Sequence, residues 1–138
     1  MAIRFVEIHP SSDPEQLNQE WVILENDGKT PFHTRGCGMT VGRRGSNKKS
    51  LLGVIDPGFT LAPGERMRMC TGNPGTQSHG TAPEDDVKNY FLFLPKLYLN
   101  KGAGTVLTLT LRGLQVAKAE QDPAGERGLA AAAAAPAK

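Results

Sequence analysis

The sequence predicts an all-β fold, arranged as a sandwich or barrel of about eight or nine short strands. Short apolar or alternating runs recur along the chain, and turn residues separate them: 16 Gly and 10 Pro occur among 138 residues. No segment shows the apolar period of an amphipathic helix. A chain of this length is expected to form one domain with a core of its own, without help from a metal or a disulfide.

The central strand is expected within residues 17–28, which contain the only tryptophan, Trp21. A short apolar run there lies between a polar lead-in and an Asn-Asp-Gly turn signal. In a strand, Trp21 and Ile23 point to one face while Val22 and Leu24 point to the other. Because both faces are apolar, we expect both to be covered, with Trp21 holding the two sheets of a sandwich together.

Eight further strands are expected before and after this one, separated by Pro, Gly or polar residues. The clearest alternation lies in residues 105–111, where Leu107 and Leu109 point inward and the intervening threonines point outward. A two-residue Arg-Gly connection then forms a hairpin with residues 114–116. The other expected strands are residues 3–9, 38–41, 51–55, 66–71, 90–94 and 97–99.

The strand expected at residues 66–71 has methionines on one face and Arg66 and Arg68 on the other. This alternation predicts one buried side and one solvent-exposed side. A Pro-Gly pair ending at Gly64 precedes the strand and fits the central positions of a type II turn, where glycine accepts a positive φ.

The strand pattern ends after Lys118. Residues 121–138 consist largely of Pro, Gly, Ala and charged residues and end in an alanine run that is too short for a stable helix in water. We therefore expect a domain of residues 1–118 and a disordered, Ala-rich tail of residues 119–138.

Basic residues are unevenly distributed, although the formal net charge is only +2. Residues 28–55 contain six basic residues and no acidic one, so the rest of the chain carries a net charge of −4. The six are Lys29, Arg35, Arg43, Arg44, Lys48 and Lys49. Arginine and lysine on a Gly-rich loop suit sequence-independent, salt-sensitive contact with phosphates.

A candidate nucleic-acid site therefore consists of Arg35, Arg43, Arg44, Lys48 and Lys49. The alternative is an ordinary solvated loop. Phe32 is the only aromatic residue near this stretch, which makes base stacking on the loop an unfavourable interpretation.

The two cysteines, Cys37 and Cys70, have no metal-ligand spacing and cannot form a disulfide framework. They are interpreted as two small buried residues, or as a bridge if their Cα atoms lie within about 7 Å. The N-terminal sequence does not resemble a secretory signal, and no apolar run is long enough to span a membrane. These features predict a cytoplasmic protein.

The run Leu-Asn-Gln-Glu-Trp-Val in residues 17–22, followed by Leu24, Asn26 and Gly28, resembles the opening signature of the lamin-tail domain. Three further segments are similar to that family in order: its first strand, its central Pro-Gly turn and strand, and its closing hairpin. These segments are residues 3–9, 59–72 and 100–116. The resemblance covers about residues 3–118 and implies an immunoglobulin-like β-sandwich.

The chain departs from the family pattern at two places. Residues 36–41 read Gly-Cys-Gly-Met-Thr-Val where the family usually has Gly-Trp-x-Leu, and residues 97–99 replace a second tryptophan. The resemblance implies no catalytic activity, since in nuclear lamins the domain is a binding surface for chromatin and protein partners. Without heptads or a rod, the chain looks like a free-standing bacterial version.

No catalytic constellation is recognisable, and neither an enzyme nor a cofactor is expected. His9, His33 and His79 lack the spacing of metal ligands and are interpreted as loop or surface histidines. The acidic run of residues 84–86 lacks the Asp-x-Asp-x-Asp pattern of a calcium loop, which favours a solvated loop.

The sequence therefore predicts a non-enzymatic structural or protein-interaction module, which presents loops or an edge strand to a protein partner or to a second copy. The alternative is a nucleic-acid-binding module that uses the basic loop of residues 35–49. We expect no membrane partner and no small-molecule substrate.

Overall fold

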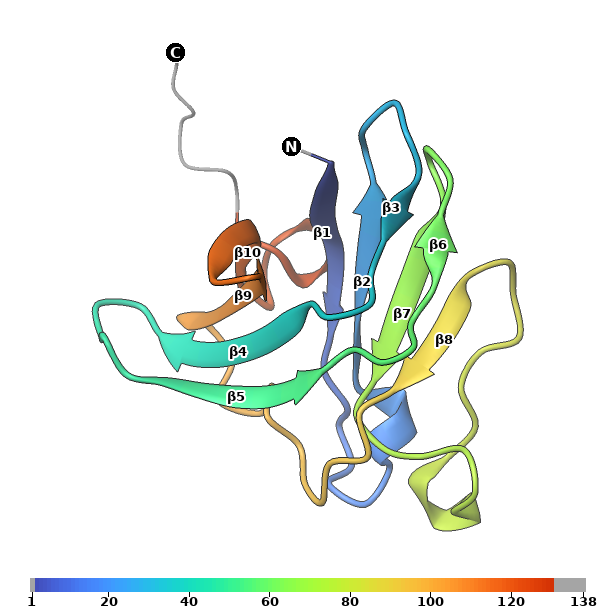
Figure 1. Ribbon diagram of the computed structural model, residues 1–138. Helices are drawn as coiled ribbons and strands as arrows, with labels where there is room; N and C mark the ends of the chain where they lie inside the picture. The colour runs from blue at the N-terminus through green and yellow to red at the C-terminus, as the bar shows by residue number, and fades with distance from the viewer. Residues whose placement is uncertain (1, 131–138) are drawn as a thin grey trace.

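The computed structural model describes residues 2–130 and confirms the all-β prediction (Figure 1). Two four-stranded sheets form the two layers of a sandwich, and a two-stranded ribbon lies beside them. The first sheet has the order β1-β2-β7-β8, the second has the order β10-β9-β4-β5, and β3 pairs with β6 in the ribbon. The strands are β1 (Ile3–His9), β2 (Trp21–Asn26), β3 (Phe32–His33), β4 (Gly38–Arg43), β5 (Lys49–Val54), β6 (Thr60–Leu61), β7 (Arg66–Cys70), β8 (Lys88–Phe91), β9 (Thr105–Leu111) and β10 (Leu114–Glu120).

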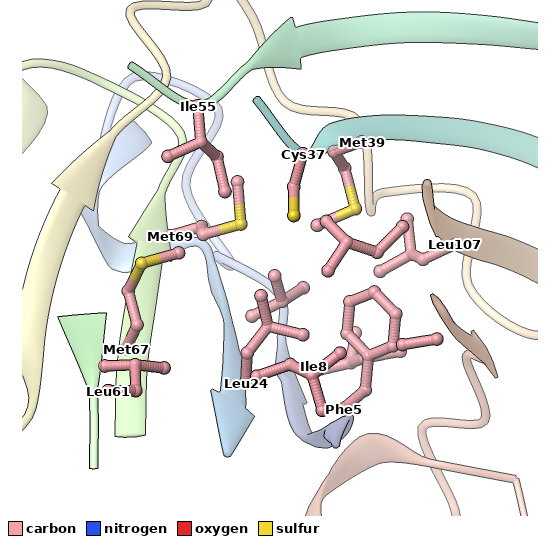
Figure 2. Packing of buried hydrophobic residues seen from close by; sticks show 14 of the residues in the cluster. Phe5, Ile8, Leu24, Cys37, Met39, Ile55, Leu61, Met67, Met69 and Leu107 are labelled. Carbon is pink, nitrogen blue, oxygen red and sulfur yellow. The ribbon is translucent and has the colours of Figure 1, made fainter. Parts of the chain in front are cut away.

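The core lies between the two sheets. Val22 and Leu24 from β2 meet Leu107 and Leu109 from β9, and all four side chains are fully buried, as the alternation predicts. Figure 2 shows the same core, in which Cys37 and several methionines lie among branched aliphatic side chains. This packing is the main source of stability that an all-β domain of this size needs.

Trp21 does not hold the sheets together, and that prediction is wrong. Trp21 and Ile23 lie on the outer face of the first sheet, where they pack with Val6 and Cys70 in a second, smaller cluster. The indole is still buried, because Phe91 and a neighbouring loop residue pack against the cluster. The sequence shows that both faces of β2 are apolar, but it does not show which face meets the other sheet.

Residues 97–99 are not a strand, contrary to the prediction. Leu97 and Leu99 are buried, which accounts for the apolar pattern. The backbone N–H groups of Tyr98 and Leu99 donate to the carboxylate of Glu20 instead of to a neighbouring strand. β8 also begins two residues earlier than expected, at Lys88, and pairs parallel with β7.

Two predicted turns are confirmed. The N–H of Glu65 donates to the carbonyl of Ala62 across 2.9 Å, and Gly64 has a φ of 86°. In the hairpin between β9 and β10, Arg112 and Gly113 have φ angles of 54° and 81°. Two successive positive φ values are typical of the type I′ turn that matches the twist of hairpin strands.

The prediction of a disordered tail from residue 119 is wrong as far as residue 130. β10 continues to Glu120, and the buried Gln121 donates its side-chain amide to the carbonyl of Leu99 across 3.1 Å. The short 3₁₀ helix η3 (Glu126–Gly128) then contacts β1, and Leu129 packs against the core. Residues 119–130 therefore belong to the domain; the rest of the predicted tail, residues 131–138, lies outside the described residues.

Candidate interaction surface

The β4–β5 hairpin extends away from the body of the sandwich (Figure 1). Its loop, residues 44–48, is closed by the N–H of Ser46, which donates to the carbonyl of Arg43 across 3.0 Å. The N–H of Arg44 donates to the carbonyl of Gly104 across 2.8 Å. The tip of the hairpin is thereby attached to the turn that precedes β9.

β5 is the edge strand of the second sheet and pairs with β4 alone. From Lys48 to Leu52 its side chains alternate between two environments, and the register with β4 shifts between Leu51 and Gly53. Lys48, Ser50 and Leu52 line a hollow on the side of the hairpin that also carries Val41, which packs against the core; this is called the inner side. Lys49 lines a second hollow on the opposite, outer side. Leu51 also lies on the outer side, next to Gly38, and is 62% exposed.

The structure brings four of the five predicted nucleic-acid residues together. Arg43, Arg44, Lys48 and Lys49 lie at the turn of the hairpin, from the end of β4 to the start of β5. Arg35 precedes the opposite end of β4, where its Nε lies 3.1 Å from a carboxylate oxygen of Asp56. Arg35 is therefore not part of the same group.

The hairpin cations differ in whether their charge is balanced. Arg44 forms an ion pair with Glu120 across 2.9 Å. The Arg43 guanidinium donates to the hydroxyl of Thr105 at 2.8 Å and to the carbonyl of Ala103 at 2.9 Å, both neutral acceptors. Within the described part of the chain, neither Arg43 nor Lys48 nor Lys49 forms an ion pair.

The inner hollow has a volume of about 590 Å³ and is named the basic hollow below. Its cations are Arg43, Lys48, Lys96 and Lys101, and no acidic residue lines it. Val41, Leu52 and Tyr98 supply apolar surface in the same hollow. The outer hollow, of about 630 Å³, is also basic but includes Glu120.

Lys96 and Lys101 are site residues that the sequence interpretation missed. They lie in the connection between β8 and β9, about 50 residues after the hairpin in the chain. No spacing rule links such distant lysines. The pairing of β9 with β4 places the turn that precedes β9 near Arg43, but the sequence contains no signal for that pairing.

A second group of charged residues lies on the outer face of the first sheet, and these residues bind one another instead of facing solvent. Arg68 is only 3% exposed, so the prediction that its face of β7 is solvent-exposed is wrong. Its guanidinium donates to both carboxylate oxygens of Asp85, at 3.2 and 2.7 Å, and to the side chain of Asn89 at 2.8 Å. Its central carbon lies 4.9 Å from the ring centre of Trp21.

The indole of Trp21 is fixed from other directions as well. Its N–H donates to the carboxylate of Glu7 across 3.0 Å, and the ring of His9 stacks on it with centroids 4.0 Å apart. The hydrogen bonds from Arg68 lower the pKa of Asp85, so this carboxylate remains charged. Asp85 is thus a partner of Arg68 rather than part of a freely solvated acidic loop.

Glu20 is a buried carboxylate with a structural role. It accepts hydrogen bonds from the hydroxyl of Thr71 at 2.6 Å and from the N–H groups of Tyr98 and Leu99 at 3.1 and 3.0 Å. Burial raises the pKa of Glu20, although the three hydrogen bonds oppose this rise. Glu20 therefore fixes the connection that carries Lys96 and Lys101.

The remaining candidates are dispersed. Cys37 lies in the core between the sheets and Cys70 in the outer cluster, and both are unbridged. His33 contacts the hydroxyl of Thr60, and His79 lies near Asn73. Among residues 2–130, no three His, Cys, Asp or Glu side chains come together as a metal site.

The chain matches no model of a known protein family and no curated protein. Among residues 2–130, no helix has the length and hydropathy needed to cross a bilayer.

Proposed function

We propose that the chain is a non-enzymatic protein-interaction module of the lamin-tail type, with an immunoglobulin-like sandwich, and that β5 is its binding edge. The observation that carries this proposal is the open edge itself: β5 pairs on one side only, and Leu51 and Val54 on it are 62% and 52% exposed. An unpaired edge strand with exposed apolar side chains accepts a strand from another chain.

The other sheet edges are less suited to this role. β1 and β10 lie against each other where the two sheets meet, and β8 has only four residues. At the far end of β5, the hydroxyl of Tyr90 donates to the carbonyl of Val54 across 3.4 Å. The open, regularly alternating part of the edge is therefore the stretch from Lys49 to Leu52.

The lamin-tail assignment is supported by what the signature residues do. Glu20 anchors the connection before β9, and Asn26 donates to the carbonyls of Thr30 and Leu61 while it accepts from the N–H of Gly28. These residue types serve the fold. A sequence signature made of them is therefore compatible with a family whose members differ in their partners.

Site-specific photo-cross-linking tests the proposed edge. A photoreactive residue at position 51 is expected to form a nuclease-resistant product with a polypeptide, either a partner or a second copy of the chain. The purified partner is then expected to bind Leu51→Lys at least about tenfold more weakly than the wild type, because a charge replaces an apolar contact. Leu114→Lys is the matched control, since Leu114 is 71% exposed on β10. Equal binding by the two variants would contradict the proposal.

Nucleic-acid binding is a second candidate function, and one observation favours it: Arg43, Lys48 and Lys49 form no ion pair among the described residues. Such cations can replace the counter-ions of a phosphate backbone. Fluorescence anisotropy with labelled oligonucleotides tests this function. With three contacts, log K is expected to fall with log salt at a slope of about −2 to −3. Arg43→Gln/Lys48→Gln/Lys49→Gln should abolish binding, whereas Arg35→Gln should not.

A further inference from the structure

β5 offers a different chemistry on each of its two sides. Lys48, Ser50 and Leu52 face the basic hollow, while Lys49 and Leu51 face the outer side of the hairpin. A strand that adds to β5 alternates in the same way, so every second side chain enters the basic hollow. The side chains between them lie beside Leu51.

The basic hollow places several positive charges together without a counter-charge. Lys48 comes from the hairpin, Lys96 and Lys101 come from the connection before β9, and Arg43 comes from the end of β4. No acidic residue lines the hollow, and none of these four side chains forms an ion pair among residues 2–130. Opposite charge on a partner complements such a surface and speeds its association.

We infer that β5 binds an extended acidic polypeptide segment, in which carboxylate side chains alternate with apolar ones. The carboxylates enter the basic hollow, and the apolar residues cover Leu51. This inference rests on the proposed function, because it names the class of partner for the same edge.

A polypeptide fits these observations better than a nucleic acid does. The unpaired side of β5 offers backbone N–H and C=O groups, which another main chain can match in a ladder and a sugar-phosphate backbone cannot. The exposed Leu51 also offers apolar surface that an apolar side chain of a polypeptide can cover.

The test uses a short, end-blocked peptide that alternates valine and glutamate, with binding measured by calorimetry on the full chain. A valine–lysine peptide and oligothymidylate are the comparison probes. We expect the valine–glutamate peptide to bind at least about tenfold more tightly than the valine–lysine peptide. Lys96→Gln/Lys101→Gln should weaken its binding about tenfold, because two charges that face the hollow are lost.

Lys29→Gln/Arg112→Gln removes the same charge at two exposed positions away from the hollow and should leave peptide binding unchanged. Peptides that are N-methylated at odd or at even positions test the ladder, since only one of the two sets removes N–H groups that face β5. One methylated peptide should therefore bind and the other should not.

The outcomes separate the inference from the proposed function. If the valine–glutamate peptide does not bind, or binds equally to Lys96→Gln/Lys101→Gln, the inference is overturned; the proposed function still stands if position 51 cross-links to a polypeptide. If oligothymidylate alone binds and position 51 cross-links only to nucleic acid, both fall and the second candidate function replaces them.

Discussion

The outer face of the first sheet and the β5 edge of the second sheet both carry basic residues, but the surroundings of those residues differ. Arg68 is almost fully buried and is matched by Asp85, Asn89 and the ring of Trp21. Lys48 and Lys96 are exposed and line a hollow that no acidic residue lines. A basic residue is therefore available to a partner only where the fold leaves its charge unmatched.

The largest expected loss of stability follows from replacing Trp21 on the outer face of the first sheet. Trp21→Ala should lower the free energy of unfolding by about 3–5 kcal/mol, because a buried aromatic ring leaves a cavity. Leu51→Ala, on the exposed edge, should change it by at most about 0.5 kcal/mol. Urea denaturation of both variants measures the difference. Equal losses of stability in the two variants would contradict the contrast between a buried Trp21 and an exposed Leu51.

The two arginine–carboxylate pairs give the next contrast. Arg68→Ala should destabilise the protein by about 1–3 kcal/mol, because it removes buried charged hydrogen bonds and a cation–π contact. Arg44→Ala breaks an exposed ion pair with Glu120 and should cost about 0–1 kcal/mol. Thermal and chemical denaturation check the order, and a larger loss in Arg44→Ala would reverse the comparison.

Acid should lower the stability of the protein through the Asp85–Arg68 pair on the outer face of the first sheet. The lowered pKa of Asp85 means that its pairing with Arg68 contributes stability above the ordinary pKa of an aspartate and loses it as the pH falls through the lowered value. The wild type should therefore lose stability more steeply on acidification than Asp85→Asn. Glu20 acts in the opposite sense, because its raised pKa favours folding at low pH and that contribution is lost as the pH rises. Parallel acid profiles of the two proteins would contradict the assignment to Asp85.

The smallest expected effect is on the reactivity of the two cysteine thiols. Burial raises the pKa of Cys70 to about 12 and also raises that of Cys37, so neither should react with a thiol reagent in the folded protein at neutral pH. Trp21→Ala should speed labelling of Cys70, because it uncovers the outer cluster that the two residues share, without affecting Cys37 in the core. Mass spectrometry of labelled peptides distinguishes the two sites.

Much of the fold could be predicted from the sequence, because alternation in residues 105–111 and the apolar run after Glu20 directly reflect strand burial. The errors arise where alternation is ambiguous. Trp21 and Val22 are both apolar, so their faces could not be assigned to core or exterior. Leu97 and Leu99 look like strand residues, but the N–H groups of Tyr98 and Leu99 donate to the carboxylate of Glu20 instead of to a neighbouring strand.

The candidate site was less predictable for a related reason. The hairpin cations form a visible local cluster, but Lys96 and Lys101 reach the same hollow only through tertiary structure. The pairing of Arg44 with Glu120, across the sheet, likewise has no local signal. Charge balance depends on distances between segments, and a linear pattern does not contain them.

The attachment of the hairpin to the turn before β9 has a consequence for binding thermodynamics. The Arg44–Gly104 hydrogen bond and the contacts of Arg43 with Ala103 and Thr105 hold the β5 edge in place before any partner arrives. A preorganised edge loses little conformational entropy on association, so the entropy cost falls mainly on the incoming segment. Affinity should then respond more to rigidifying the ligand, for example by cyclisation, than to stiffening this protein.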